Sequence, residues 1–455
     1  MLRESLSDNE VDYTTGSIGR ALRLLAIPMM LEMSMESVFS VVDIIFVSRL
    51  GTDAVAAVGI TEALITVLYA VAIGLGVGVT AMVSRRIGAK RPDAAASVTG
   101  QAIWLGAVLS VVIGVAGATF AEDMLRLMGA STNVVETGKG FTAVLLGGSA
   151  SILYLFILNA AFRGAGDAAV ALRSLWLANG INIVLDPCLI FGLGPFPELG
   201  VTGAAIATTI GRGVGVLYQL WYLLDGRGRL DFQLRHLRVE TALIARMLVI
   251  SLGGIGQFLI STSSWIGVMR IVALYGSPAI AAYTIALRML EFAFLPAWGL
   301  GNAAATLVGQ NLGAGRPDRA EQSAWRASKY NVIFMSSIGL LLLMLAPGIA
   351  NLFTEDPDVV RYTTSCLRIM GLGYPMYALG MIMVQSLNGA GDTASPSTLN
   401  LICFWLVQIP LAFWLATEAE LGPNGVFIAI VIAESLLTVL GVYVFRKGGW
   451  KQQIA

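Results

Sequence analysis

The sequence predicts an all-α integral membrane protein with twelve transmembrane helices, arranged as two six-helix lobes related by parallel pseudo-two-fold symmetry. Composition is the first observation behind this fold class. Of the 455 residues, 56% are hydrophobic and only 13% are charged, whereas a soluble protein carries about 25% charged residues. The second observation is a series of long apolar stretches, and the third is an internal repeat that divides the chain in two.

The apolar stretches are each long enough to cross a bilayer as a helix, which takes about 20 residues. The expected helices are 18–48, 54–83, 96–119, 134–163, 169–193, 200–224, 242–274, 279–309, 328–352, 359–387, 396–417 and 424–446. Six helices fall in each half. Because that number is even, both halves enter the membrane from the same side, and the symmetry axis lies along the membrane normal.

The repeat has one constant offset, the step from Gly164 to Gly389. Gly-Ala-Gly-Asp at 164–167 recurs at 389–392, and Gly-Leu-Gly at 74–76 recurs at 299–301. The loop Ile-Gly-Ala-Lys-Arg-Pro-Asp also returns, at the same offset, as Leu-Gly-Ala-Gly-Arg-Pro-Asp. We call two positions separated by this offset repeat equivalents. So long a period is not that of a solenoid and is typical of membrane transporters whose two homologous halves enclose a substrate path.

These observations give the expected domain boundaries. They are a cytoplasmic tail at 1–16, an N-lobe at 17–224, a linker at 225–241, a C-lobe at 242–447 and a second cytoplasmic tail at 448–455. The net charge is zero, which argues against a nucleic-acid partner. The expected partners are the lipid bilayer and small organic substrates, and the chain is expected to act as a monomer.

Charge in the loops predicts the orientation. Alternate loops and the C-terminal tail carry basic residues, which are Arg85, Arg86, Lys90, Arg91, Arg227, Arg229, Arg235, Arg238, Arg316, Arg319, Arg446, Lys447 and Lys451. The opposite loops carry mostly acids, which are Glu122, Asp123, Glu198, Glu355, Asp356, Asp358, Glu418 and Glu420. Basic loops are retained in the cytoplasm. Both termini are therefore expected in the cytoplasm, and the protein in the cell membrane.

Three acids share one face of the first predicted helix. At about 100° per residue, Glu36 lies about 40° and Asp43 about 20° around the helix from Glu32. A charge at the bilayer centre costs about 2.5 kcal/mol or more, so these acids are candidates for function. Pro28, one turn earlier, leaves a carbonyl unmatched and predicts a bend point.

The fifth predicted helix carries a second polar pair. Asn182 and Asp186 are spaced i, i+4 on one face, and Pro187 follows directly. In the fourth helix Asn159 interrupts an apolar run, which indicates either an interhelical hydrogen bond or a place in the site.

The second half has fewer acids in the corresponding helices. The repeat equivalents of Glu36 and Asp43 are Ser261 and Val268, so ion chemistry is expected in the N-lobe. Glu291 follows Arg288 by one helical turn, which allows either an internal ion pair or a substrate contact. Glu62 and Glu434 are expected to be interfacial or paired residues.

With these motifs in place, the chain resembles the multidrug and toxic compound extrusion (MATE) transporters over nearly its whole length. The resemblance rests on Val42-Asp43, the paired loops at 87–93 and 312–318, Arg-Gly-Ala-Gly-Asp at 163–167 and Asn-Ile-Val-Leu-Asp-Pro at 182–187. It implies a V-shaped pair of six-helix lobes that alternates between inward and outward openings. It also implies export of substrates against an inward flow of H⁺ or Na⁺.

The resemblance is to prokaryotic members with N-lobe aspartates and implies a cation site there. By motif, that site falls on Asp43, Asp186, Asn159 and Asn182, and a sixth-helix hydroxyl often joins it, for which Thr208 is the candidate. This chain departs from the family in two places. The seventh helix has no carboxylate, which argues against a C-lobe cation site, and Glu36 stands where an uncharged polar residue is more usual.

The expected mechanism is antiport. Carboxylates packed together can share protons, so deprotonated Asp43, Asp186 and Glu36 are expected to favour a cationic, amphipathic substrate. Entry of H⁺ or Na⁺ would neutralise them and release it. Sodium, if used, would bind at Asp43, Asp186 and Asn182; no other metal and no cofactor is expected. Glu32, Pro28 and Glu291 are candidates for substrate contact or gating.

Two other functions remain open at this point. A lipid-linked oligosaccharide flippase would need central basic residues for its phosphates, for which Arg270 and Arg288 are available. A membrane-embedded enzyme would need a nucleophile and base or a metal cluster. The one histidine, His236, lies in the linker and no paired Cys or His motif exists, so only an acid-only aspartyl site stays possible.

Overall fold

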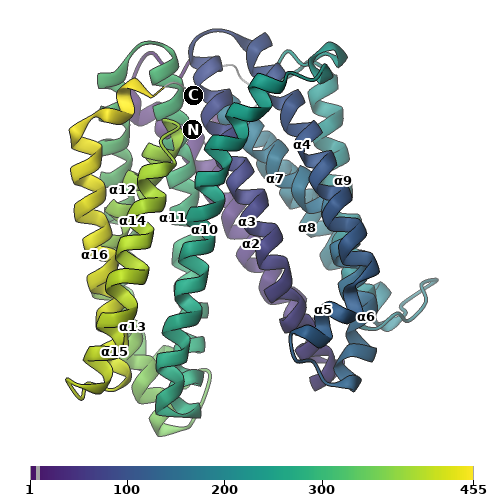
Figure 1. The fold of residues 1–455 in the computed structure, drawn as a ribbon, viewed down its shortest axis with the longest axis vertical. Coiled ribbons are helices and arrows are strands. Elements are labelled where there is room, and N and C mark those ends of the chain that lie inside the picture. The colour runs from purple at the N-terminus through teal and green to yellow at the C-terminus, as the bar shows by residue number, and fades with distance from the viewer. Residues whose placement is uncertain (1, 7–10, 454–455) are drawn as a thin grey trace.

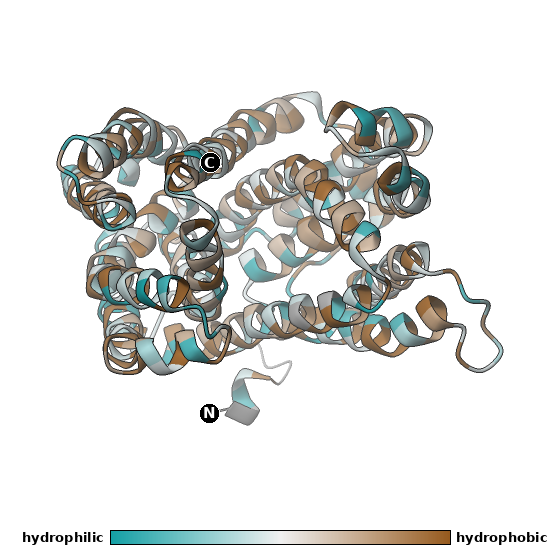
Figure 2. Ribbon diagram, turned by 90° about the horizontal axis from the view of Figure 1, so that it is seen from below, coloured by the Kyte–Doolittle hydropathy of each residue, from teal (hydrophilic) through white to brown (hydrophobic). Residues whose placement is uncertain are grey.

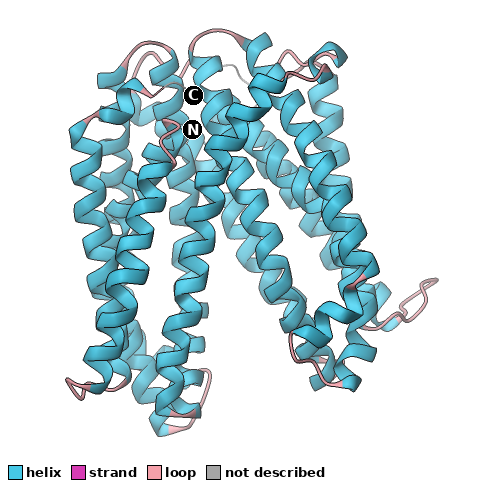
Figure 3. Cartoon of the chain, viewed as in Figure 1, coloured by secondary structure: helices cyan, strands magenta, loops and turns pink. Residues whose placement is uncertain are grey.

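The computed structural model describes residues 2–6 and 11–453, and these residues form helices and loops without any strand (Figure 3). The α-helices are α1 Leu2–Ser5, α2 Ile18–Ser48, α3 Thr52–Gly88, α4 Pro92–Thr119, α5 Ala121–Leu127, α6 Thr132–Gly147, α7 Ser149–Ala165, α8 Ala168–Phe191, α9 Val201–Leu224, α10 Thr241–Val272, α11 Ser277–Gly313, α12 Pro317–Asn351, α13 Pro357–Gly389, α14 Ala394–Asn400, α15 Ile409–Thr417 and α16 Pro423–Lys447. Short 3-10 helices are η1 Leu234–Leu237, η2 Ala273–Tyr275 and η4 Gly449–Gln452, and η3 Leu401–Gln408 is a π-helix. Parts of the two expected tails, residues 1, 7–10 and 454–455, lie outside the described residues.

The helices form two bundles that meet at one end of the molecule and diverge toward the other (Figure 1). The first bundle contains α2 to α9, and the second contains α10 to α16. Both chain ends lie near the end where the bundles meet, here called the closed end. The loops that carry most of the basic residues, such as 89–91 and 314–316, lie at the same end. The V shape agrees with the predicted fold class.

The outer surface of the helices is apolar. Seen from the diverging end, hydrophobic residues colour much of both bundles (Figure 2). Val112, Leu252 and Met344 are each more than 60% exposed. Among the described residues, nine helices are long and apolar enough to span a membrane, or ten if α6 and α7 together form one span. These do not include α2, which carries three acids, or α9, which carries Arg212; the expected total of twelve therefore remains a prediction.

Two of the expected helices are not continuous α-helices. The segment 134–163 was expected as one helix, but it is divided into α6 and α7, which meet at an angle of 41°. Glycines and serine at the break, Gly147, Gly148 and Ser149, explain the bend, because such residues weaken the helix locally. The segment 396–417 changes from α-helix to π-helix and back at α14, η3 and α15.

Glycines bring the two bundles into backbone contact at the closed end. A Cβ atom on Gly88 of α3 would lie 1.9 Å from the carbonyl oxygen of Gln310 in α11. A Cβ atom on Gly313 of α11 would lie 1.9 Å from the carbonyl oxygen of Arg85 in α3. Gln310 and Gly313 are the repeat equivalents of Arg85 and Gly88, so each contact is the repeat of the other. This reciprocity is what a parallel repeat requires.

The repeated Gly-Ala-Gly-Asp motif forms turns at the same end. Gly166 and Gly391 have φ values of 95° and 88°, a left-handed conformation that favours glycine. The carbonyl oxygen of Gly164 accepts a hydrogen bond from Gln310 Nε2 at 3.0 Å, and that of Ala390 accepts one from Arg85 Nη1 at 3.1 Å. The motif therefore supplies acceptors that join the bundles.

Residues 11–16 of the N-terminal segment connect loops from both bundles. Arg229, just after the first bundle, donates to the carbonyl oxygen of Val11 at 2.7 Å. Arg316, at the start of α12, donates to the carbonyl oxygen of Thr14 at 2.7 Å, and Arg319 donates to that of Gly16 at 2.9 Å. These contacts further stabilise the closed end.

Candidate functional site

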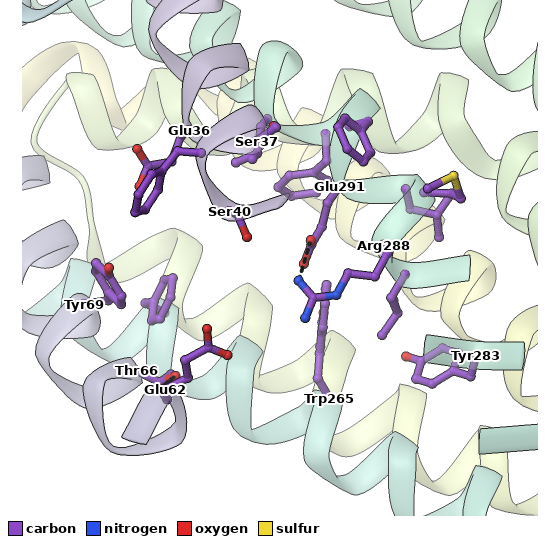
Figure 4. Close-up of a pocket in the computed structure, with 18 of the residues that line it drawn as sticks. Glu36, Ser37, Ser40, Glu62, Thr66, Tyr69, Trp265, Tyr283, Arg288 and Glu291 are labelled. Carbon is purple, nitrogen blue, oxygen red and sulfur yellow. Dashed lines mark hydrogen bonds and ion pairs between the residues drawn. The ribbon is translucent and has the colours of Figure 1, made fainter. Parts of the chain in front are cut away.

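A cavity of about 920 Å³ lies between the bundles. In Figure 4, Glu62 of α3 lies across from Arg288 and Glu291 of α11, whereas the side chain of Glu36 of α2 points away from that pair. Phe353, in the loop after α12 at the diverging end, also lines the cavity. The volume falls within the range of about 300–1,000 Å³ that is usual for small-molecule sites. The cavity can therefore hold a small organic molecule.

Four of the predicted site residues come together on α2, α8 and α9, which pack against one another. Asp186 is fully buried, and neither of its carboxylate oxygens has a hydrogen-bond partner among the described residues. Asn182 Nδ2 donates to Thr208 Oγ1 at 2.9 Å, which leaves Asn182 Oδ1 without a partner. Asp43 Oδ1 is buried and unpartnered as well, and the Asp43 and Asp186 carboxylates interact electrostatically. We call Asp43, Asn182, Asp186 and Thr208 the paired-aspartate site.

The paired-aspartate site reaches the cavity on one side only. Asp43 and Thr208 line the cavity, whereas Asp186 and Asn182 lie behind them. A buried carboxylate without donors is costly unless it takes up a proton or a cation. Four unpartnered oxygens, from two carboxylates and an amide, form a donor set suited to H⁺ or to a hard cation such as Na⁺.

Asn159 belongs to a different polar cluster. It was expected in the cation site, but its Nδ2 donates to Glu32 Oε1 at 3.0 Å, and Gln219 donates to its Oδ1. Glu32 is fully buried and forms an ion pair with Arg163 at 2.9 Å. Neither Glu32 nor Asn159 lines the cavity. The structure thus separates Asn159 from the paired-aspartate site and places Glu32 where it does not meet a substrate in this state.

Replacing Arg163 with methionine is expected to lower the free energy of unfolding by about 3–5 kcal/mol, because it leaves the Glu32 carboxylate buried without its cation. The double variant Glu32→Gln/Arg163→Asn should recover most of this loss. It copies the repeat equivalents Gln257 and Asn388, which form a neutral hydrogen bond of 3.2 Å. Thermal unfolding of the purified protein in detergent measures both effects. Parental stability of Arg163→Met would contradict the assignment.

Glu36 has a cationic neighbour that sequence reasoning missed. Asn179 Nδ2 donates to Glu36 Oε2 at 3.2 Å, and Arg212 Nη2 lies 4.0 Å from Glu36 Oε1. Arg212 is buried, and it also donates to the Tyr69 hydroxyl at 2.9 Å. The signal in the sequence was an arginine in the middle of the sixth predicted helix, one turn after Thr208. Glu36 therefore has both a hydrogen-bond donor and an ion-pair partner, whereas no hydrogen bond or ion pair from the described residues reaches the side chain of Asp43 or Asp186.

Glu291 and Pro28 lie at two other points of the bundle interface. Glu291 is 3.9 Å from Arg288, and both side chains line the cavity and are more than half exposed (Figure 4). Helix α2 continues as an α-helix through Pro28. Directly after Pro28, the carbonyl oxygen of Met29 would lie 2.6 Å from a Cβ atom on Gly299 of α11. Pro28 therefore precedes a point where α2 of the first bundle crosses α11 of the second.

His236 is held in the linker between the bundles. Its Nε2 lies 2.9 Å from Asp93 Oδ1, and its Nδ1 accepts a hydrogen bond from the Gln233 backbone at 2.9 Å. Within the described residues no group of three or more His, Cys, Asp and Glu side chains is placed to hold a metal ion. His236 thus has structural partners at the closed end.

Comparison with known proteins gives consistent results across sequence and structure. The MatE family model matches the chain twice, at residues 28–188 and at 254–414. The probable multidrug resistance protein YoeA of Bacillus subtilis is 30% identical over 96% of this chain and 95% of its own length. An FAD transporter of Shewanella oneidensis is 27% identical over 94% of this chain and 95% of its own length. A solved outward-facing structure of a multidrug resistance MATE transporter is 28% identical, covers 95% of this chain and 96% of its own, and superposes with a TM-score of 0.89.

Proposed function

This chain belongs to the MatE family of multi-pass membrane transporters, and from that premise we propose that it is a secondary active antiporter that exports cationic, amphipathic organic compounds in exchange for H⁺ or Na⁺. A member of this family is a transporter and not an enzyme. The name of its relative YoeA, a probable multidrug resistance protein, supports small organic compounds as cargo.

The observation that carries the proposal is the paired-aspartate site at the wall of the large cavity. Deprotonated Asp43 and Asp186 give this wall a negative potential that favours a cationic substrate. A proton or Na⁺ that binds their unpartnered oxygens removes this potential and favours release. The ion can drive transport only if it binds the two conformations unequally, because equal affinity shifts no population. Burial of Asp186 in this conformation offers a physical basis for that difference.

Loop charge supports the direction of transport. Basic loops are retained in the cytoplasm, and here they lie at the closed end together with both termini. On this basis the cavity opens away from the cytoplasm and the termini are cytoplasmic. We further propose that the protein acts as a monomer in the plasma membrane. An ion from outside then reaches Asp43 through the cavity, and the substrate leaves by the same path.

The charge balance of the cavity supports a cationic cargo over an anionic one. Its lining contains five acids and two arginines. Arg212 contacts Glu36 and Tyr69, and Arg288 lies 3.9 Å from Glu291, so both arginines have partners within the protein. The anionic cargo of a lipid-linked oligosaccharide flippase, or of the FAD transporter, would need unpaired cations. The charges that line the cavity therefore support an anionic cargo less than a cationic one.

Transport in proteoliposomes tests the proposal. With purified protein in sealed vesicles, we expect a cationic dye to move against its gradient when either a pH gradient or a Na⁺ gradient at fixed pH is imposed. Vesicles without protein, and vesicles clamped with ionophores, serve as controls. Movement of the dye that follows neither gradient would overturn the antiport mechanism, and comparison of the two gradients identifies the coupling ion.

A further inference from the structure

A second cavity of about 400 Å³ extends into the second bundle. It continues from the large cavity, because both are lined by the same six residues, Thr66, Phe258, Trp265, Phe294, Tyr377 and Glu434. Its other lining residues include Gln257, Asn388 and Asn400. We call it the C-bundle cavity.

Glu434 is the one charged residue among those that line the C-bundle cavity. It lies in the middle of α16, and no hydrogen bond or ion pair reaches its side chain from the described part of the chain. The expectation that Glu434 is an interfacial or paired residue is therefore wrong. Its carboxylate stands where the two cavities meet and is free to receive a ligand.

Two of the amides that line the C-bundle cavity, those of Asn388 and Asn400, use their N–H donors within the protein and leave their carbonyl oxygens as acceptors. Asn388 Nδ2 donates to Gln257 Oε1 at 3.2 Å, and Asn400 Nδ2 donates to Ser261 Oγ at 3.1 Å. The carbonyl oxygens Asn388 Oδ1 and Asn400 Oδ1 have no partner, although the two residues are only 3% and 4% exposed. A ligand that satisfies these oxygens must bring N–H or O–H groups.

The repeat explains why these groups remain available. Gln257 and Asn388 are the repeat equivalents of Glu32 and Arg163, which neutralise each other in the first bundle and line neither cavity. In the second bundle the pair is uncharged and faces the cavity. The carboxylate of Glu434 is therefore not neutralised by an arginine at this place.

Aromatic side chains form much of the remaining wall. They are Phe258, Trp265, Phe294, Trp298, Tyr377 and Phe404. Aromatic faces attract organic cations, and the attraction is stronger where water is excluded. They also stack on flat aromatic ligands. The C-bundle cavity thus combines one carboxylate, two carbonyl acceptors and aromatic faces.

We propose that the C-bundle cavity binds the cationic end of the substrate, a protonated amine or amidinium carried on an aromatic ring. Glu434 accepts its charged N–H groups, and Asn388 and Asn400 accept the others. This inference rests on the proposed function and assigns the two tasks to different bundles. The paired-aspartate site of the first bundle holds the coupling ion, and the C-bundle cavity holds the cargo.

Equilibrium binding to the purified full-length protein in detergent, without any gradient, tests the inference. The probe is 4′,6-diamidino-2-phenylindole, a flat aromatic molecule with two amidinium groups, and 2-phenylindole is its uncharged core. We expect Glu434→Gln to weaken binding of the diamidine about tenfold or more, and to leave binding of 2-phenylindole within about twofold. Glu434→Asp, which keeps the charge, should recover part of the affinity. Glu198→Gln, on an exposed loop of the first bundle, is the matched carboxylate-to-amide control.

Two results would overturn the inference. One is equal affinity of the parent protein and Glu434→Gln for the diamidine. The other is a parent protein that binds the diamidine no more tightly than 2-phenylindole. Either result leaves gradient-driven export untouched, so the inference can fail while the proposed function stands. Conversely, suppose that Glu434→Gln loses affinity for the diamidine while the parent protein shows no gradient-driven export. That result would support the cargo site and overturn the antiport mechanism.

Discussion

Replacing Asp186 with asparagine is expected to lower gradient-driven export at least about tenfold, toward the rate of vesicles without protein. Asparagine keeps the shape of the side chain but can neither bind a proton nor carry a negative charge. Asp186 is fully buried with both carboxylate oxygens unpartnered, so its negative charge is not satisfied by a hydrogen bond from the described residues and depends on the bound ion. Initial rates of dye transport in proteoliposomes, under the same imposed gradient for each variant, measure the effect.

Companion variants make this test specific. Asp43→Asn should act like Asp186→Asn, since the two carboxylates interact and share one site. Glu36→Gln should have a smaller effect, because Asn179 and Arg212 already compensate Glu36. Glu198→Gln, on an exposed loop, should transport at the parental rate. Parental transport by both aspartate variants would exclude the paired-aspartate site from coupling.

Replacing Gly88 with valine is expected to prevent the closed end from closing and so to block transport. Even the first carbon of the new side chain would lie 1.9 Å from the carbonyl oxygen of Gln310, which belongs to the helix backbone and cannot move alone. Gly313→Val should have the same effect through the carbonyl oxygen of Arg85, because this contact is the repeat of the first. The population should therefore shift toward a conformation that is open at the end that carries the termini.

Accessibility of a single cysteine at position 84 measures this shift. Ser84 is fully buried at the contact between the bundles, where its Oγ would lie 1.9 Å from a Cβ atom on Gly309. With Cys188, Cys366 and Cys403 replaced by alanine, Ser84→Cys should react slowly with a polar maleimide in the parent and rapidly in Gly88→Val. Gly348→Val, where a Cβ atom meets nothing within 4 Å, is the control. Slow labelling together with parental transport in Gly88→Val would refute the role of this contact.

The predicted helices show how far local pattern determines the fold. A run of apolar residues specifies a helix from its own composition, and most of the expected segments correspond to single helices. The break between α6 and α7 was missed, although Gly147-Gly148-Ser149 stands in the sequence. Whether such glycines bend a helix depends on what packs there, and Thr209 of α9 closely approaches Gly148.

In the candidate site, too, the local sequence predicted which residues share a helix face but not which residues they contact. Helical periodicity placed Glu32, Glu36 and Asp43 on one face of the first helix, but it could not tell which helices that face would meet. Asn159 is hydrogen-bonded to Glu32 although it lies in a different helix, far along the chain. Arg212 compensates Glu36 across an even longer separation in sequence. The packing of the helices determines which residues so distant in sequence become partners. The local sequence carries no pattern that reveals this packing.

By itself the sequence determined the class of protein, its repeat and its intramembrane acids, because apolar length, a fixed offset and charge are properties of the chain alone. Only the tertiary structure decided which acids are neutralised. It paired Glu32 with Arg163, compensated Glu36, and left Asp43 Oδ1, both carboxylate oxygens of Asp186 and the Glu434 side chain without hydrogen bonds from the described residues. The physical reason is that the cost of a charge depends on the groups that surround it in space, and those groups come from helices far apart in the sequence.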